Sequence, residues 1–112
     1  MEGGLKRLEI WTAAGGPDYA SKPRPVVILQ DERIPTESIT ICGLTSDPAE
    51  VPFYRPKVEA SATSGLVEAS RIMVDKITTL PRRKLGRRLG KLSPVEAGEL
   101  RQAIYLFLGF DV

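Results

Sequence analysis

The sequence contains no histidine and a single cysteine. Without histidine the chain cannot form a Ser-His-Asp triad, a Cys-His pair, a two-histidine ribonuclease mechanism or a histidine-ligated metal site. Cys42 can form neither an internal disulfide nor a cysteine-based zinc site within one chain. Any catalysis must therefore use arginine, lysine, tyrosine, carboxylates, hydroxyls or backbone N–H groups, and we expect no metal and no cofactor.

Long apolar segments are also absent. No run approaches the roughly 18–20 residues that span a bilayer, and residues 1–7 lack the apolar core of a signal peptide. Together with the lone cysteine, these absences lead us to expect a cytoplasmic chain that does not enter a membrane.

The composition that remains is typical of a globular protein, with 42% hydrophobic and 27% charged residues. The length of 112 residues is enough for one domain with a modest core, which we expect to cover residues 1–112. The formal net charge of +2 divides into −2 for residues 1–56 and +4 for residues 57–112. So mild a bias permits nucleic-acid binding without requiring it.

An arginine between two prolines opens the segment with the strongest strand pattern. Pro23 and Pro25 enclose Arg24, and four aliphatic residues follow before Gln30. The aliphatic run predicts a central strand near residues 25–30, buried on both faces. The prolines restrict the backbone on both sides of Arg24, which would hold a cation in one place but would equally serve to begin a strand.

The remaining strands are shorter and more polar. Alternating apolar and polar residues predict strands at residues 8–12 and 38–44, and the glycine- and proline-rich residues 13–22 predict a loop. Two prolines make residues 51–58 an edge strand or a bent one. Further strand is predicted at residues 66–67, 70–77 and 86–92, with a helical turn at residues 82–85.

The C-terminal segment carries an unusually complete helix signal. Ser93 fits the N-cap, Pro94 the first helical position and Glu96 the third, which together make a capping box. Gly109 is a natural stop. We expect one apolar helical face to be core, made of Leu100, Ala103, Ile104, Phe107 and Leu108. Several short strands followed by a helix favour a mainly β fold, a small antiparallel barrel with a C-terminal helix.

Two stretches are candidates for a site. Arg24 and Lys22 lie on the same side of an extended segment, where a guanidinium would suit a phosphate. Thr45, Ser46 and Asp47 follow the third strand and would otherwise only cap a turn. If neighbouring strands pair antiparallel, Arg24 and Thr45 stand side by side at one end of the sheet.

Three further features have open interpretations. Residues 82–91 hold six cations and no acid, which suits either a solvated face or contacts with a phosphate backbone. Asp75 and Lys76 either form a strand-end ion pair or line a groove near Arg24. The spacing of Gly86 and Gly90 carries no signal, because no apolar helix surrounds it.

These features, in this order and spacing, resemble the MazF/PemK family of toxin endoribonucleases over nearly the whole chain. The motifs that carry the resemblance are Glu9-Ile10-Trp11, Lys22-Pro23-Arg24-Pro25-Val26-Val27-Ile28, Thr45-Ser46, Gly65-Leu66 and Ser70-Arg71-Ile72-Met73-Val74-Asp75-Lys76-Ile77. The resemblance implies an SH3-like antiparallel β-barrel plus helix, of the CcdB/MazF type, assembled as a homodimer.

The resemblance also implies an activity, partners and site residues. The activity is metal-independent cleavage of single-stranded RNA by attack of the 2′-OH, and the partners are RNA and a cognate antitoxin. Arg24 and Thr45 would be catalytic. Residues 15–22 would cover the RNA. The residues expected to bind RNA are Tyr19, Ser21, Lys22, Ser46, Asp75 and Lys76.

The sequence departs from the family pattern at two places. Met73 stands where some PemK-type members carry a catalytic arginine, and no carboxylate immediately precedes Lys22, the nearest by position being Asp18. A different class of function also stays open. CcdB-like toxins share the fold but bind DNA gyrase without cleaving RNA, and an SH3-like binding module would need neither Arg24 nor Thr45.

Overall fold

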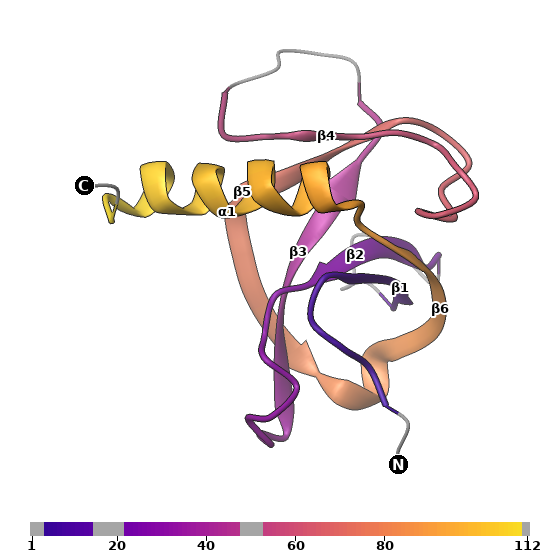
Figure 1. The fold of residues 1–112 in the computed structure, drawn as a ribbon. Coiled ribbons are helices and arrows are strands. Elements are labelled where there is room, and N and C mark those ends of the chain that lie inside the picture. The colour runs from indigo at the N-terminus through magenta and orange to yellow at the C-terminus, as the bar shows by residue number, and fades with distance from the viewer. Residues whose placement is uncertain (1–3, 15–21, 48–52, 111–112) are drawn as a thin grey trace.

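The computed structural model describes residues 4–14, 22–47 and 53–110. Within them, six strands form one antiparallel sheet in the order β4-β5-β3-β2-β1-β6, and an α-helix follows the last strand. Figure 1 shows the sheet curling into a half-barrel, with the helix crossing above it in this view. The elements are β1 (Glu9–Ala13), β2 (Arg24–Ile28), β3 (Ser38–Thr45), β4 (Lys57–Val58), β5 (Ser70–Pro81), the 3-10 helix η2 (Arg82–Lys84), β6 (Leu85–Lys91) and α1 (Pro94–Leu108). The predicted mainly β fold with a C-terminal helix is confirmed.

Alternation along the strands gives the sheet two apolar faces. One face contains Ile10, Val27 and Cys42, all fully buried, and packs against Leu100 and Ala103 of α1. The other face carries a second cluster, made of Ala13, Val26, Ile28, Ile39 and Ile41. Because β2 contributes to both clusters, its unbroken aliphatic sequence is explained, and the predicted central strand is confirmed.

The long strand β5 lies between β3 and the two-residue strand β4. Only residues 57–58 of the predicted edge strand pair with β5. Residues 53–55 form a turn and a bend, Pro56 belongs to no regular element, and residues 51–52 lie outside the described residues. Pro56 has no N–H to donate, although its carbonyl accepts from Ile72 at 2.9 Å. The strand prediction is therefore wrong for residues 53–56.

The strand predicted at residues 66–67 is also wrong, because a buried serine holds this segment in a turn. The hydroxyl of Ser64 accepts from the N–H of Leu66 at 3.2 Å and donates to the carbonyl of Glu59 at 2.7 Å. Ser64 is 1% exposed, so these hydrogen bonds satisfy a hydroxyl that burial would otherwise leave without partners.

The helix α1 begins and ends as predicted. Ser93 Oγ accepts from the N–H of Glu96, and the Glu96 carboxylate accepts from the N–H of Ser93, which completes the capping box. Gly109 adopts the left-handed conformation, with φ of 81°, that ends helices. None of the helices in the described part of the chain is long and apolar enough to cross a membrane.

The apolar face of α1 is buried at Leu100 and Ala103, partly buried at Ile104 and exposed beyond it. Leu100 and Ala103 are nearly fully buried, whereas Phe107 and Leu108 are 42% and 49% exposed. Figure 1 shows the second half of α1 extending past the sheet. The prediction that the whole face is core is therefore wrong at Phe107 and Leu108, which have no sheet beneath them.

Candidate functional site

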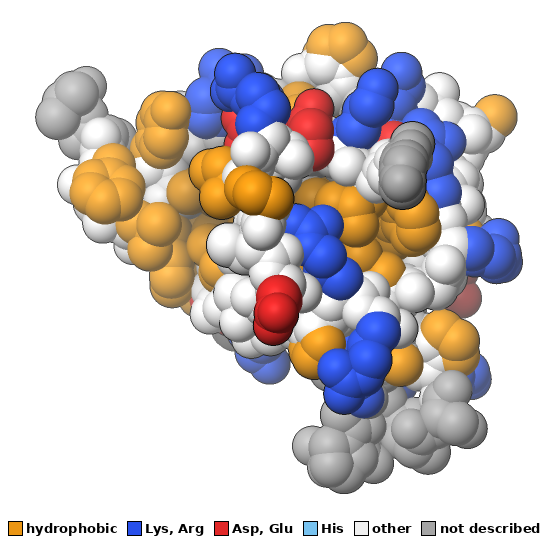
Figure 2. Space-filling model, turned by 90° about the horizontal axis from the view of Figure 1, so that it is seen from below, with side chains coloured by type: hydrophobic (Ala, Val, Ile, Leu, Met, Phe, Trp, Pro, Cys, Tyr) orange, Lys and Arg blue, Asp and Glu red, His pale blue; other side chains and the backbone are white. Residues whose placement is uncertain are grey.

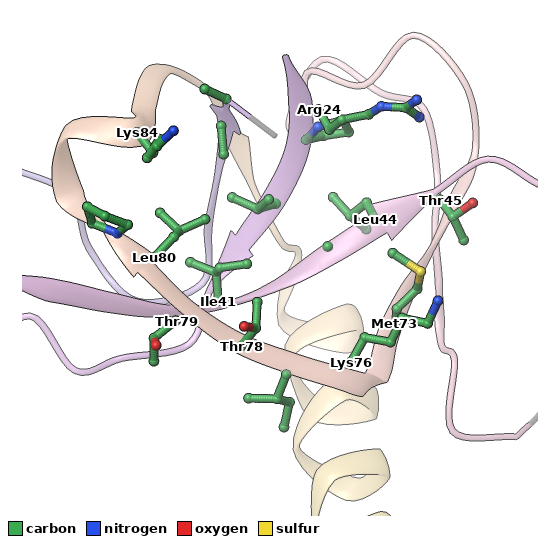
Figure 3. A pocket seen from close by; sticks show the side chains of 17 residues that line it. Arg24, Ile41, Leu44, Thr45, Met73, Lys76, Thr78, Thr79, Leu80 and Lys84 are labelled. Atoms are coloured by element: carbon green, nitrogen blue, oxygen red, sulfur yellow. The ribbon is translucent and has the colours of Figure 1, made fainter. Parts of the chain in front are cut away.

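The ends of β2 and β3 bring Arg24 and Thr45 together. The two strands pair antiparallel with Val26 opposite Gly43. Continuing that register by two residues sets Arg24 opposite Thr45, the first residue of β2 and the last of β3. The expectation that both residues stand at one end of the sheet is thus met, and Figure 3 shows them at the same end of a hollow.

Two hollows meet at this pair. The first has a volume of about 600 Å³ and an apolar floor that includes Val26, Ile41 and Leu80. The second, of about 830 Å³, lies on the other side of the pair. Arg24, Pro25, Leu44 and Thr45 line both hollows. A group bound between Arg24 and Thr45 can therefore extend a substituent into each hollow.

The hydroxyl of Thr45 also shapes the chain beyond β3. Its oxygen accepts a hydrogen bond from the N–H of Asp47 at 3.1 Å. A hydroxyl has two lone pairs and one proton, so capping the turn leaves the O–H of Thr45 able to donate to a ligand. The two interpretations of Thr45, turn cap and ligand donor, are therefore compatible.

Cations border both hollows. Lys76 and Lys84 line the first, and Lys22 lines the second. Ser46 lines the second hollow and a smaller one of about 260 Å³ beside it. Figure 2 shows one face of the molecule, on which Lys and Arg side chains stand around an apolar area near its centre. This arrangement suits an anion that carries planar, partly apolar groups, such as a nucleotide chain.

Met73, which stands where some PemK-type proteins carry an arginine, has a packing role. Met73 lines the first hollow, and its Cε lies 3.0 Å from where a Cβ at Gly43 would be. The methionine therefore covers the glycine on the neighbouring strand and adds an apolar wall to the hollow. It provides no proton donor there.

Asp75 is committed to an ion pair. Its two carboxylate oxygens accept from Nε and Nη2 of Arg55, each at 2.8 Å, and both side chains are 21% exposed. These hydrogen bonds hold the pKa of Asp75 below its usual value. Asp75 is not among the residues that line the three hollows described above. Of the neighbours predicted to bind RNA, Lys76 reaches the first hollow and Asp75 does not.

Other candidates have different positions. Asp18, Tyr19 and Ser21 lie outside the described residues. Cys42 is buried in the core, and desolvation raises the pKa of its thiol to about 12, which leaves no thiolate near neutral pH. Within the described residues, no cluster of three acidic, cysteine or histidine side chains is arranged to hold a metal ion.

Sequence reasoning did not single out three residues that line these hollows. Lys84 reaches the first hollow, while Arg87 and Glu68 line the second. The two cations belong to the basic run at residues 82–91, in which the sequence favours no single member. A glycine inside the predicted strand, Gly86, was the available signal, since glycine in a strand often marks a bulge that redirects the next side chain.

The chain matches known proteins in sequence. Residues 6–108 match the family described as PemK-like, MazF-like toxin of type II toxin-antitoxin system. The chain is 38% identical over 106 residues to a probable endoribonuclease MazF from Mycolicibacterium smegmatis, covering 94% of this chain and 97% of that protein.

Solved structures agree in fold. The Mycobacterium tuberculosis toxin MazF-mt6 superposes with a TM-score of 0.78 at 27% identity, over 93% of this chain and 99% of that one. A MazE-MazF structure from Deinococcus radiodurans gives a TM-score of 0.75 at 17% identity, over 96% and 98%, which shows a shared fold. From its sequence match and its fold, the chain belongs to the family of PemK-like, MazF-like toxins of type II toxin-antitoxin systems.

Proposed function

We propose that this toxin is an endoribonuclease that cleaves single-stranded RNA at short sequence motifs without a metal ion. The observation that carries the proposal is that Arg24 and Thr45 both line the two hollows, at one end of the sheet. The similarity to a probable endoribonuclease MazF supports it. Family membership also favours this activity over the gyrase-binding alternative.

The proposed chemistry is transfer of the phosphate within the RNA. The ribose 2′-oxygen forms a bond to the adjacent phosphorus, and the bond from phosphorus to the 5′-oxygen of the next nucleotide breaks. The products are a 2′,3′-cyclic phosphate and a 5′-OH, so the proton lost by the 2′-OH is balanced by the proton gained by the leaving 5′-oxygen. Negative charge builds on the phosphorane oxygens during this step, and a preorganised guanidinium at Arg24 stabilises it. The O–H of Thr45 donates to a nonbridging oxygen or orients the 2′-OH.

The flanking residues would bind the RNA on each side of that phosphate. Lys22 and Ser46 serve the second hollow, and Lys76 serves the first. Tyr19 and Ser21 keep their proposed role of covering the RNA. For Asp75 we propose an indirect contribution, because its carboxylate holds Arg55 rather than facing a hollow.

We propose two protein partners. A cognate antitoxin would cover the basic groove, which is supported by an endoribonuclease of similar fold from a Mycobacterial species, solved in complex with its cognate antitoxin. A second copy of this chain would cover the exposed end of α1, where Phe107 contacts the ring of Tyr54 and Phe110 is 69% exposed. Burying such a contiguous apolar surface is favourable, and large exposed patches commonly mark interfaces.

End-group analysis tests the proposed activity. Purified protein is incubated with single-stranded RNA of mixed sequence in excess EDTA, and the ends of the fragments are identified. We expect fragments with cyclic phosphate and 5′-OH ends. An absence of cleavage on any RNA, together with inhibition of DNA gyrase supercoiling, would replace the proposal with the CcdB-like alternative.

A further inference from the structure

Strand β6 contains an irregularity beside the second hollow. Its register with β1 pairs Trp11 with Arg88 and Ala13 with Leu85. Between these two pairs β6 has one residue more than β1. This is a β-bulge, a feature that redirects side chains and is common beside functional sites. The extra residue lies within residues 86–87, opposite Thr12.

The bulge separates two neighbouring arginines. Arg88, paired with Trp11, binds the Glu9 carboxylate through Nε at 3.0 Å. Glu9 and Thr12 lie three residues apart in β1 and therefore face opposite sides of the sheet, so Arg88 at Glu9 and Arg87 beside Thr12 are on opposite sides. Arg87 lines the second hollow together with Thr12 and Arg24. Arg88 thus forms an ion pair within the sheet, and Arg87 points to the second hollow.

Thr12 fixes the bulge in place. Its hydroxyl oxygen accepts from the backbone N–H of Arg87 at 3.0 Å. A Cβ at Gly86 would overlap the same oxygen, so a larger residue at that position would have to displace the Thr12 hydroxyl. The residue pair Gly86 and Thr12 therefore determines where the backbone of Arg87 sits.

The guanidinium of Arg87 has no ion pair within the described residues, unlike Arg88 with Glu9 or Arg55 with Asp75. Arg82, in the same basic run, donates to the backbone carbonyl of Thr36. Arg87 is exposed and shares its hollow with Lys22 and with two acids of the described chain, Asp47 and Glu68, neither of which forms an ion pair with it. Its charge is therefore available to a ligand that enters the hollow beside Arg24.

We propose that Arg87 binds a backbone phosphate of single-stranded RNA in the second hollow, next to the phosphate held at Arg24. The proposal rests on the proposed function and assigns one member of the basic run to the substrate. A guanidinium binds phosphate through paired N–H donors, so the contact would position the RNA without reading its sequence.

Binding measurements test this proposal without cleavage. A fully 2′-O-methylated RNA of mixed sequence has no free 2′-OH to attack, and its affinity is measured over a series of salt concentrations. The variants are Arg87→Ala and Arg87→Lys, with Arg83→Ala as the matched control. Arg83 is an exposed arginine of the same run that lines none of the hollows described above.

We expect Arg87→Ala to weaken binding about tenfold at low salt, the loss of one charge-assisted hydrogen bond. Its slope of log affinity against log salt should be shallower by about 0.7, the value for one phosphate of a single strand. Arg87→Lys should keep the slope, because the charge remains. Arg83→Ala should match the wild type in both affinity and slope.

The outcomes separate the two proposals. If the wild type cleaves RNA and Arg87→Ala has the same affinity and slope as Arg83→Ala, Arg87 makes no phosphate contact and this inference alone is overturned. If the wild type neither binds nor cleaves RNA, the proposed function fails and the inference fails with it.

Discussion

Arg24 begins β2 and Thr45 ends its antiparallel neighbour β3, and both line the two hollows that meet there. The pairing of β2 with β3 fixes this relationship through the backbone. A phosphate between the two side chains would have one nucleotide in each hollow. The Arg24 guanidinium and the Thr45 hydroxyl could therefore both donate hydrogen bonds to one phosphate of a bound nucleotide chain.

The hydroxyl of Thr45 has an observed role in the turn and a proposed role in cleavage, which substitutions can separate. We expect Thr45→Val to slow RNA cleavage by a factor of about 10²–10³, the usual cost of removing one transition-state donor. Loss of the bond to the N–H of Asp47 should lower the free energy of unfolding by about 1 kcal/mol. Thr45→Ser keeps the hydroxyl and should retain most of both. Equal activity of Thr45→Val and wild type would assign Thr45 to the turn alone.

The ion pair of Arg55 and Asp75 predicts a dependence of stability on pH. Hydrogen bonds from Arg55 lower the pKa of Asp75 in the folded chain. The ion pair therefore stabilises the fold fully at pH values above the pKa of Asp75 in the unfolded chain, near 3.9. This stabilisation is lost as the pH falls through the lower pKa of Asp75 in the folded chain. Arg55→Ala should cost about 1 kcal/mol near pH 7 and nearly nothing in strong acid, as measured by urea unfolding.

The pair of Arg33 and Asp31 is the matched comparison, because Arg33 is 86% exposed. Arg33→Ala should change the unfolding free energy less than Arg55→Ala does near neutral pH. A cost for Arg55→Ala that stays constant from neutral to acid pH would assign its effect to packing rather than to the ion pair.

Glu96 connects the start of α1 to the segment that follows β4. Its carboxylate accepts from the N–H of Ser93 at 2.9 Å and from the N–H of Glu59 at 3.1 Å. We expect Ser93→Ala to cost about 1 kcal/mol through the lost cap, and Glu96→Ala to cost more because two segments lose a partner. Thermal unfolding measures both, and a smaller loss for Glu96→Ala would contradict the bridging role.

The exposed end of α1 predicts self-association. Leu108→Glu should convert a dimer to a monomer in sedimentation experiments, because a charge at a buried apolar contact is strongly unfavourable. Val95→Glu is the control, since Val95 is 70% exposed at the opposite end of the same helix. A wild-type chain that is monomeric at all concentrations, or a dimer unaffected by Leu108→Glu, would reject this surface as the interface.

Local signals were sufficient for much of the fold. The capping box at Ser93 and the aliphatic run of β2 are contained in a few adjacent residues, and both predictions are confirmed. Placing Arg24 and Thr45 at one end of the sheet needed one further assumption, that neighbouring strands are antiparallel, and β2 and β3 are antiparallel.

Contacts between segments far apart in the chain could not be predicted from local sequence patterns. Asp75 pairs with Arg55, 20 residues earlier, and no local pattern names that partner. Gly86 and Gly90 seemed to carry no signal, yet each lies against another segment, Gly86 against Thr12 and Gly90 against the carbonyl of Thr63. The side to which Arg87 points depends on the bulge at Gly86, which only the pairing of β1 with β6 reveals.

The most direct test of the proposed site is the rate of RNA cleavage by Arg24→Ala, measured in EDTA beside the wild type and Arg83→Ala. Arg83 is an exposed arginine outside the hollows described here, so its removal controls for a general loss of charge. We predict that the wild type and Arg83→Ala cleave at similar rates and that Arg24→Ala is slower by at least about 10²-fold. Cleavage by Arg24→Ala at the wild-type rate would contradict the assignment of this site.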